Sequence, residues 1–160
     1  MSIDGHADSY GFELPLLLFG GFRAIIDELH AELARRGHPD MRPAHGFAMQ
    51  AIGKNGATAT EAGKRLGISK QAAGKTLDRL EQIGYVERAG DDTDRRRKTV
   101  KLTSRGIDAL ATSAVIFEEI RQRWRNSLGA DREAELEHDL RQMAPSESFR
   151  LDVPGWFGGA

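Results

Sequence analysis

Apolar positions along most of the chain recur every three or four residues, the spacing of a helix with one buried face. Outside a central segment, this pattern predicts helices at residues 12–37, 44–53, 103–128 and 131–143. Leu14, Leu16, Leu17 and Phe19 fall outside a single stripe, so more than one face of the first helix requires burial. The pattern therefore predicts a mainly α-helical chain.

The central segment is predicted to form two short helices joined by a tight turn. Thr58 and Glu61 have the spacing of a capping box, which marks the start of the first helix. Gly67 can adopt the left-handed conformation that ends it, and Ser69 can cap the second helix. The inward face of that second helix is predicted to hold Ala73, Leu77 and Leu80.

Two segments with strand character follow, residues 85–88 and 99–102, and they predict a β-hairpin. Its tip carries four adjacent cations, Arg95 to Lys98, which repel one another unless they lie beside phosphates. If strand geometry persists there, Asp94 and Arg96 share a face, and Asp94 can orient the guanidinium for the minor groove. A solvated turn is the alternative interpretation.

Helix, turn, helix and basic hairpin together predict a winged helix-turn-helix head at residues 44–102 that binds duplex DNA. The residues predicted to contact DNA are Ser69, Lys70, Gln71, Gly74, Lys75, Arg79, Asp94, Arg95, Arg96, Arg97 and Lys98. Gly74 is unusual because glycine costs about 1 kcal/mol inside a helix. A bare backbone there permits close approach to the DNA groove, or close packing on the neighbouring helix.

These residues resemble the MarR (multiple antibiotic resistance regulator) family over about a third of the chain. The matching motifs are Ile68-Ser69-Lys70-Gln71, Leu77-Asp78-Arg79-Leu80-Glu81, Gly84-Tyr85-Val86, Asp94-x-Arg96 and Val100-x-Leu102-Thr103-x-x-Gly106. The resemblance implies a dimeric winged-helix transcriptional regulator, often a repressor that a small ligand releases from DNA. It also implies that Asp94 and Arg96 belong to the wing motif. Gly63 and Gly74 depart from the family, which more often has larger residues there.

The flanking helices, residues 12–37 and 103–143, are predicted to mediate dimerisation. After Thr103 an apolar seam runs over some 22 residues, too long for one small head to cover. The seam comprises Ile107, Leu110, Ala114, Phe117, Ile120 or Arg121, Trp124 and Leu128. A homodimer would bind a near-palindromic operator; the alternative is that these helices pack on their own head. The tail, residues 144–160, carries Trp156 and Phe157 and is interpreted either as a disordered end or as an anchor on the helical bundle.

The formal net charge is only −1, but the charge is unevenly distributed. Residues 61–105 contain 12 Lys or Arg and 7 Asp or Glu, hence +5, which leaves −6 for the remainder. Cations therefore concentrate on the predicted reading head. The chain has no cysteine, no long apolar run and no signal-peptide pattern, so we expect a cytoplasmic protein without a membrane segment.

Other chemistry finds less support in the sequence. The five histidines, including His38 and His45 near a linker, form no i, i+4 pair, so no metal site is expected. No nucleophile motif or glycine-rich phosphate loop occurs, so neither an enzyme nor a cofactor is expected.

A pocket for a small-molecule effector is implied by the family, and six residues are candidates to line it: Phe19, Phe22, His30, His45, Phe47 and Trp124. Ordinary core packing is the alternative for each of them. Two other functional classes also remain open. One is a winged helix used for protein contacts, and the other is an architectural DNA-binding protein without ligand control.

Overall fold

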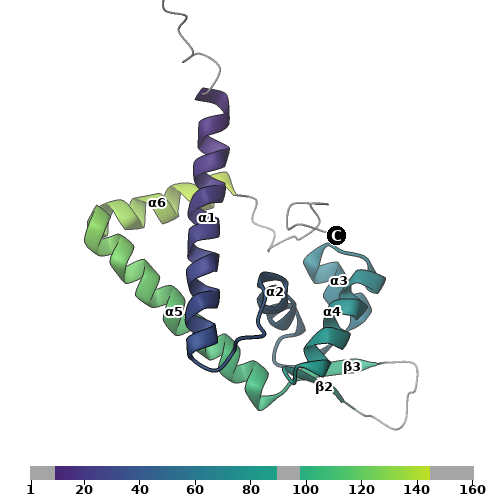
Figure 1. Cartoon of the computed structure of the whole chain (residues 1–160). Helices are drawn as coiled ribbons and strands as arrows, with labels where there is room; N and C mark the ends of the chain where they lie inside the picture. Colours follow the sequence, from purple (N-terminus) through teal and green to yellow (C-terminus); the bar gives the residue numbers. More distant parts are fainter. Residues whose placement is uncertain (1–9, 90–97, 145–160) are drawn as a thin grey trace, which may run out of the picture.

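The structure, a computed structural model, describes residues 10–89 and 98–144 (Figure 1). Its elements in chain order are α1 (Tyr10–Arg35), α2 (Pro43–Ile52), β1 (Ala57–Thr58), α3 (Ala59–Leu66), α4 (Lys70–Gln82), β2 (Val86–Ala89), β3 (Thr99–Leu102), α5 (Ser104–Leu128) and α6 (Ala130–Met143). This arrangement confirms the predicted fold class, mainly α with a small β wing. Each predicted helix is present, and α1 is shifted by two residues towards the N-terminus.

The sheet of the described chain has three antiparallel strands in the order β1-β3-β2. Val86 of β2 lies opposite Leu102 of β3, and Ala57 of β1 lies opposite Val100. The sequence predicted the hairpin of β2 and β3 but not β1, because two residues are too few to show an alternating pattern. β1 also places Thr58 at the start of α3, so the sheet and the helix-turn-helix are directly joined.

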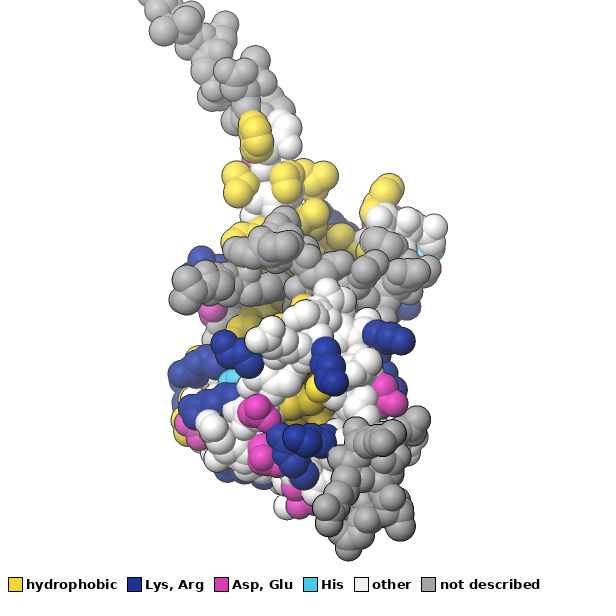
Figure 2. All heavy atoms as spheres, turned by 90° about the vertical axis from the view of Figure 1, so that its right-hand side faces the viewer, with side chains coloured by type: hydrophobic (Ala, Val, Ile, Leu, Met, Phe, Trp, Pro, Cys, Tyr) yellow, Lys and Arg dark blue, Asp and Glu magenta, His cyan; other side chains and the backbone are white. Residues whose placement is uncertain are grey.

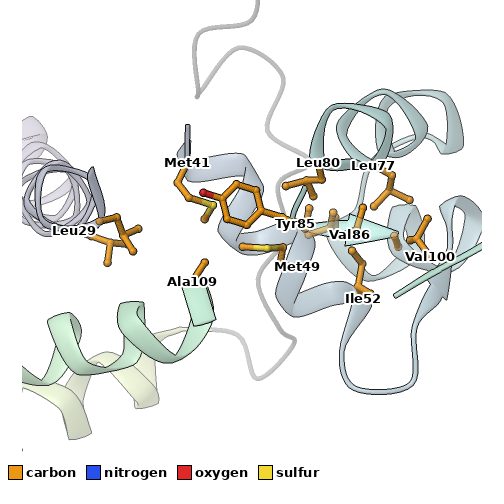
Figure 3. Close-up of a cluster of buried hydrophobic side chains, with 14 of the residues drawn as sticks. Leu29, Met41, Met49, Ile52, Leu77, Leu80, Tyr85, Val86, Val100 and Ala109 are labelled. Atoms are coloured by element: carbon orange, nitrogen blue, oxygen red, sulfur yellow. The ribbon is translucent and has the colours of Figure 1, made fainter. Parts of the chain in front are cut away.

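The core of the head lies where α2, α4 and the sheet meet (Figure 3). Ile52 from α2 and Leu80 from α4 are fully buried, and Val100 from β3 is nearly so. Tyr85, just before β2, is also fully buried although its ring carries a hydroxyl group. The predicted inward residues of α4, Ala73, Leu77 and Leu80, are all buried, which confirms the helical phase.

α1, α5 and α6 form a second part of the molecule beside the head (Figure 1). α5 turns Ala109, Ser113, Ile116 and Ile120 inward. Of the predicted seam, only Ile120 is buried, Leu110 and Phe117 are half-buried, and Ile107, Ala114, Trp124 and Leu128 are exposed. The seam thus follows a face of α5 that this chain covers only in part.

Residue 131, the predicted start of the last helix, is not its N-cap. α6 begins at Ala130, and Gly129, which precedes it, makes no side-chain capping bond. Gly129 is the last residue of the turn from α5 and has a φ of 94°, a conformation that glycine adopts readily. Asp131 instead lies in the first turn of α6, where a carboxylate still complements the helix dipole.

The N-terminal half of α1 projects beyond the other helices (Figure 1). Its apolar residues from Phe12 to Phe19 are exposed, so the described part of this chain does not supply the burial that the sequence predicted for them. In the described residues, every large exposed hydrophobic side chain belongs to α1, α5 or α6. No helix among those residues has the length and apolar character needed to cross a membrane.

Candidate nucleic-acid interface

The helix-turn-helix is built from two helices whose ends are defined by local hydrogen bonds. The Thr58 hydroxyl accepts from the Glu61 N–H at 3.2 Å, and the Glu61 carboxylate accepts from the Thr58 N–H at 3.0 Å. Ser69 caps α4 by accepting from the Ala72 N–H at 3.1 Å. Gly67 between them has a φ of 68°, in the left-handed region. The predicted caps and turn are therefore confirmed.

Gly63 explains how the two helices come so close. A Cβ at this position would lie 2.9 Å from the carbonyl oxygen of Ile68 and 3.3 Å from that of Ser69. Both oxygens belong to the backbone of the turn, so a larger side chain would push the turn away from α3. Of the two glycines that depart from the family, this one is required by packing.

The outward face of α4 carries a group of polar side chains. Lys70, Gln71 and Lys75 are exposed, as predicted for residues that contact DNA. Arg79 is exposed too, but its guanidinium donates to Gln82 at 3.4 Å, at the C-terminal end of the helix. The structure therefore brings Lys70, Gln71 and Lys75 together and places Arg79 further along α4.

A hollow of about 600 Å³ lies between α4, the start of α3 and the sheet. Its lining comprises Thr58, Ala59, Thr60, Glu61, Lys70, Gly74, Leu77, Asp78, Arg88, Lys98 and Val100. Lys70, Gly74 and Lys98 were predicted to contact DNA, whereas Asp78 and Arg88 were not. Figure 2 shows Lys and Arg side chains with interspersed acids around a small apolar area on this side of the molecule.

The acidic side chains of the hollow have partners within the protein. The Arg88 guanidinium donates to Asp78 at 2.6 Å and lies 3.3 Å from Glu81, so β2 is tied to α4. Glu61 is held by the Thr58 N–H. Arg88 was missed from the sequence, although carboxylates at positions 78 and 81 share a helix face to which a nearby strand cation can bind.

The wing tip falls outside the described residues. Asp94, Arg95, Arg96 and Arg97 were predicted to contact DNA, and those four assignments remain predictions. Lys98 is described; it is exposed at the start of the strand pair and lines the hollow beside α4. The described root of the hairpin therefore lies on the side of the head that carries Lys70.

Comparisons with known proteins address the fold and the family. A family model described as the MarR family matches residues 40–97. The crystal structure of apo wild-type MarR from E. coli is 27% identical, with a TM-score of 0.63, and the alignment covers 82% of this chain and 97% of that one. The chain is thus similar to MarR-family proteins in the matched segment and in its overall fold. No curated protein sequence matches the chain.

Two further MarR-family structures are similar to this chain. One is a mutant E. coli MarR in complex with operator DNA, 26% identical, with a TM-score of 0.67 and coverage of 86% of this chain and 97% of that one. The other is a Mycobacterium tuberculosis MarR family protein in complex with salicylic acid, 20% identical, with a TM-score of 0.59 and coverage of 82% and 96%. At that identity the second likeness concerns the fold alone.

Of the six residues proposed to line an effector pocket, two line the same small cavity. His30 and Phe47 line a cavity of about 30 Å³ between α1, α2 and α5. That volume suffices for a water molecule and is far below that of an organic ligand. Phe22 is half-buried against the core, and Phe19 is exposed.

His45 and Trp124 are the other two candidates for the effector pocket. His45 is buried, and its Nδ1 accepts from the Arg42 N–H at 3.1 Å. Burial, and then the nearby Arg42 and Arg79, lower the pKa of His45. The Trp124 ring lies on α5 beside Gly21, at 3.8 Å from the position of a Cβ there. The role of both residues in an effector pocket stays a prediction.

His38 is a residue whose role was not predicted. Its buried ring lies 3.2 Å from the Tyr85 hydroxyl through Nδ1 and 2.7 Å from the Asp108 carboxylate through Nε2. The geometry fits a ring that donates to Asp108 and accepts from Tyr85, whose hydroxyl accepts from Arg105 at 3.2 Å. These hydrogen bonds link the α1–α2 connection, the residue before β2 and α5.

In residues 10–89 and 98–144, no group of three or more His, Cys, Asp or Glu could hold a metal.

Proposed function

We propose that the protein is a sequence-specific DNA-binding transcriptional regulator. The observation that carries the proposal is the outward face of α4, where Lys70, Gln71 and Lys75 are exposed beside a hollow that reaches the wing. Lysine and glutamine side chains at the start of a recognition helix can contact phosphates and base edges in the major groove. The operator complex of the 26% identical E. coli relative supports the same use of the fold.

The wing supplies the second part of the proposed interface. Arg95, Arg96 and Arg97 are proposed to contact phosphates, and Arg96, oriented by Asp94, is proposed to enter the minor groove. Support comes from the described root of the hairpin, since exposed Lys98 lines the hollow together with Lys70. One head would then bind a major groove through α4 and the adjacent minor groove through the wing.

The protein is further proposed to act as a homodimer, with residues 12–37 and 103–143 as dimerisation helices and residues 44–102 as the DNA-binding head. The exposed apolar side chains of α1, α5 and α6 support this division. A two-fold dimer would place two copies of α4 in successive major grooves, about 34–36 Å apart, on a near-palindromic operator. The tail beyond residue 144 keeps its two interpretations.

The finer regulatory role is that of a repressor whose operator affinity a small ligand modulates. A dimer bound across a promoter blocks polymerase, which gives repression. The small cavity between α1, α2 and α5 lies at the junction of the head with the outer helices. A ligand that widened this junction and favoured one separation of the two heads would change DNA affinity by its preference for that state.

Selection of bound sequences from random duplexes tests the function. A near-palindrome is expected; enrichment of A/T content alone would instead favour an architectural protein. No enrichment would favour a winged helix that contacts proteins and would contradict the proposal. With the selected operator, Lys70→Ala and Lys75→Ala should each reduce the slope of log affinity against log salt by about 1 if the side chain contacts a phosphate.

Arg96→Ala tests the wing in the same assay and should weaken operator binding with little change in melting temperature. Arg141→Ala is a matched control, because Arg141 is exposed on α6, outside the proposed interface. Its binding isotherm should equal that of the wild type. Unchanged isotherms for Lys70, Lys75 and Arg96 variants together would refute the assigned roles.

A further inference from the structure

Gly74 occupies a position in α4 where the fold does not require a glycine. A Cβ built there meets no atom within 4 Å, in contrast to Gly63 and Gly106, whose Cβ atoms would lie 2.9 Å and 2.2 Å from backbone oxygens. The backbone of Gly74 is not in the left-handed region. Packing on a neighbouring helix, one of the two interpretations from the sequence, is therefore excluded for Gly74.

The missing side chain opens the hollow between the recognition helix and the wing. Gly74 lies in its wall, one helical turn from both Lys70 and Asp78, and Lys98 of β3 also lines it. Leu77 and Val100 line it as well, and both are almost fully buried. Any side chain at position 74 would project into this space.

The geometry of duplex DNA identifies what must occupy such a space. The major and minor grooves of one duplex are separated by a single sugar–phosphate strand. If α4 lies in the major groove and the wing enters the adjacent minor groove, that strand has to pass between α4 and the hairpin. The hollow lies between these two elements, so its occupant in the complex is a stretch of DNA backbone.

The charges of the hollow suit a polyanion. Lys70 and Lys98 are exposed cations in its lining. The carboxylate of Asp78 is paired with Arg88 at 2.6 Å, which also lies 3.3 Å from Glu81, and Glu61 caps α3. The acids are therefore engaged with cations or N–H groups of the protein, which reduces their repulsion of a phosphate chain.

We propose that Gly74 is a positioning residue that keeps the wall of α4 bare, so that one sugar–phosphate strand lies in the hollow between α4 and the wing. This inference rests on the proposed DNA-binding function and adds the part of the DNA that the hollow receives. It also predicts that Lys98 faces a phosphate of that strand, since Lys98 lines the same hollow as Gly74.

Gly74→Ala and Gly74→Leu test the proposal against Gly46→Ala as the matched control. Gly46 lies inside α2, and a Cβ there also meets no atom within 4 Å. Both alanine variants should fold and melt roughly 2–4 °C higher than the wild type, since alanine favours a helix interior. Only Gly74→Ala should lose operator affinity, by about tenfold or more, because an added methyl disrupts a close contact. Gly74→Leu should lose more.

The affinity for an unrelated duplex distinguishes backbone contact from base recognition. Backbone contacts carry no sequence information, so Gly74→Ala should weaken operator and unrelated duplex by similar factors. Wild-type affinity in Gly74→Ala would overturn the proposal, and so would a loss confined to the operator. If the wild type bound no duplex at all, both this inference and the proposed function would fail.

Replacing single operator phosphates with neutral analogues tests directly where the sugar–phosphate strand lies. Operators that carry one methylphosphonate at each position in turn should bind the wild type more weakly where the replaced phosphate lies between the two contacted grooves. Lys98→Ala should be less sensitive to replacement at one of these positions, because its cation is already absent. Equal sensitivity of Lys98→Ala and the wild type at every position would refute the assigned contact.

Discussion

The head and the outer helices of this chain use their apolar residues differently. In the head, Ile52, Leu80 and Val100 are enclosed by elements of the same chain (Figure 3). In the outer helices, Leu17 is 65% exposed and Met143 is 86% exposed. The head therefore completes its own core, whereas the outer helices retain surface that a single chain does not cover. Apolar patches of this kind mark sites of association.

The helix-turn-helix and α6 also differ in how their helices begin. The side chains of Thr58 and Ser69 accept backbone N–H groups at the starts of α3 and α4. α6 follows Gly129 without such a bond, and it is joined to α5 by ion pairs of Glu133 with Arg121 and Arg125. The helix-turn-helix thus has local caps at its helix starts, whereas α6 is held by ion pairs with the preceding helix. This contrast can be tested with single substitutions.

The largest effect on folding is expected in the head. Leu80→Ala removes a fully buried side chain and should lower the free energy of unfolding by about 2–5 kcal/mol. Urea denaturation at two protein concentrations measures this loss, which should be the same at both if the head core lies within one chain. A change below 1 kcal/mol would contradict the enclosed core.

The next effect concerns association. Leu17→Glu places a charge on the projecting half of α1 and should raise the dimer dissociation constant by about tenfold or more, since burying one leucine contributes about 1.5–3 kcal/mol. Analytical ultracentrifugation measures the change. Glu13→Gln, at another exposed α1 position, is the control and should associate as the wild type does. A monomeric wild type at micromolar concentration would end the dimer proposal.

A smaller effect is expected at the start of α3. Thr58→Ala removes the acceptor of the Glu61 N–H and should cost about 1 kcal/mol of stability. Thr60→Ala, two residues later and exposed, should change stability by less than about 0.5 kcal/mol. Thermal unfolding of the two variants provides the comparison; equal melting temperatures would show that the cap does not stabilise the head.

The most modest effect depends on pH. Burial lowers the pKa of His45, so the unfolded chain takes up the proton at higher pH than the folded one. The full contribution is present above the ordinary histidine pKa and is lost as the pH falls through the lowered value. The unfolding free energy of the wild type should decline as the pH falls from about 8 to about 5. His45→Gln should make this decline shallower, whereas His138→Gln, on exposed α6, should not. Parallel profiles for wild type and His45→Gln would contradict this assignment.

The sequence predicted features that depend on a few neighbouring residues. Thr58 and Ser69 were identified as caps because each bonds to a residue three positions away, at Glu61 and Ala72. The recognition-helix face followed from helical periodicity alone. These local rules were sufficient to place Lys70, Gln71 and Lys75 together.

Contacts between distant segments escaped prediction. His38 meets Tyr85 and Asp108, which are 47 and 70 residues away, and no spacing rule relates them. The role of Arg88 depends on how a strand passes α4, and β1 depends on pairing with β3. Gly74 was noticed in the sequence, but its two interpretations could be separated only by the space around it.

α5 gives the fold a mechanical property. It spans 25 residues, roughly 37 Å. Its capping residue, Thr103, follows β3 directly; its N–H donates to Tyr85 and its hydroxyl to Gly84. The base of the wing is therefore hydrogen-bonded to the residue at the N-terminal end of α5, and the C-terminal end of α5 joins α6. A tilt of about 5° at the far end would displace the base by roughly 3 Å, close to the rise of one base pair. A small angular change in α5 would thus move the base of the wing by a distance on the scale of one base-pair step.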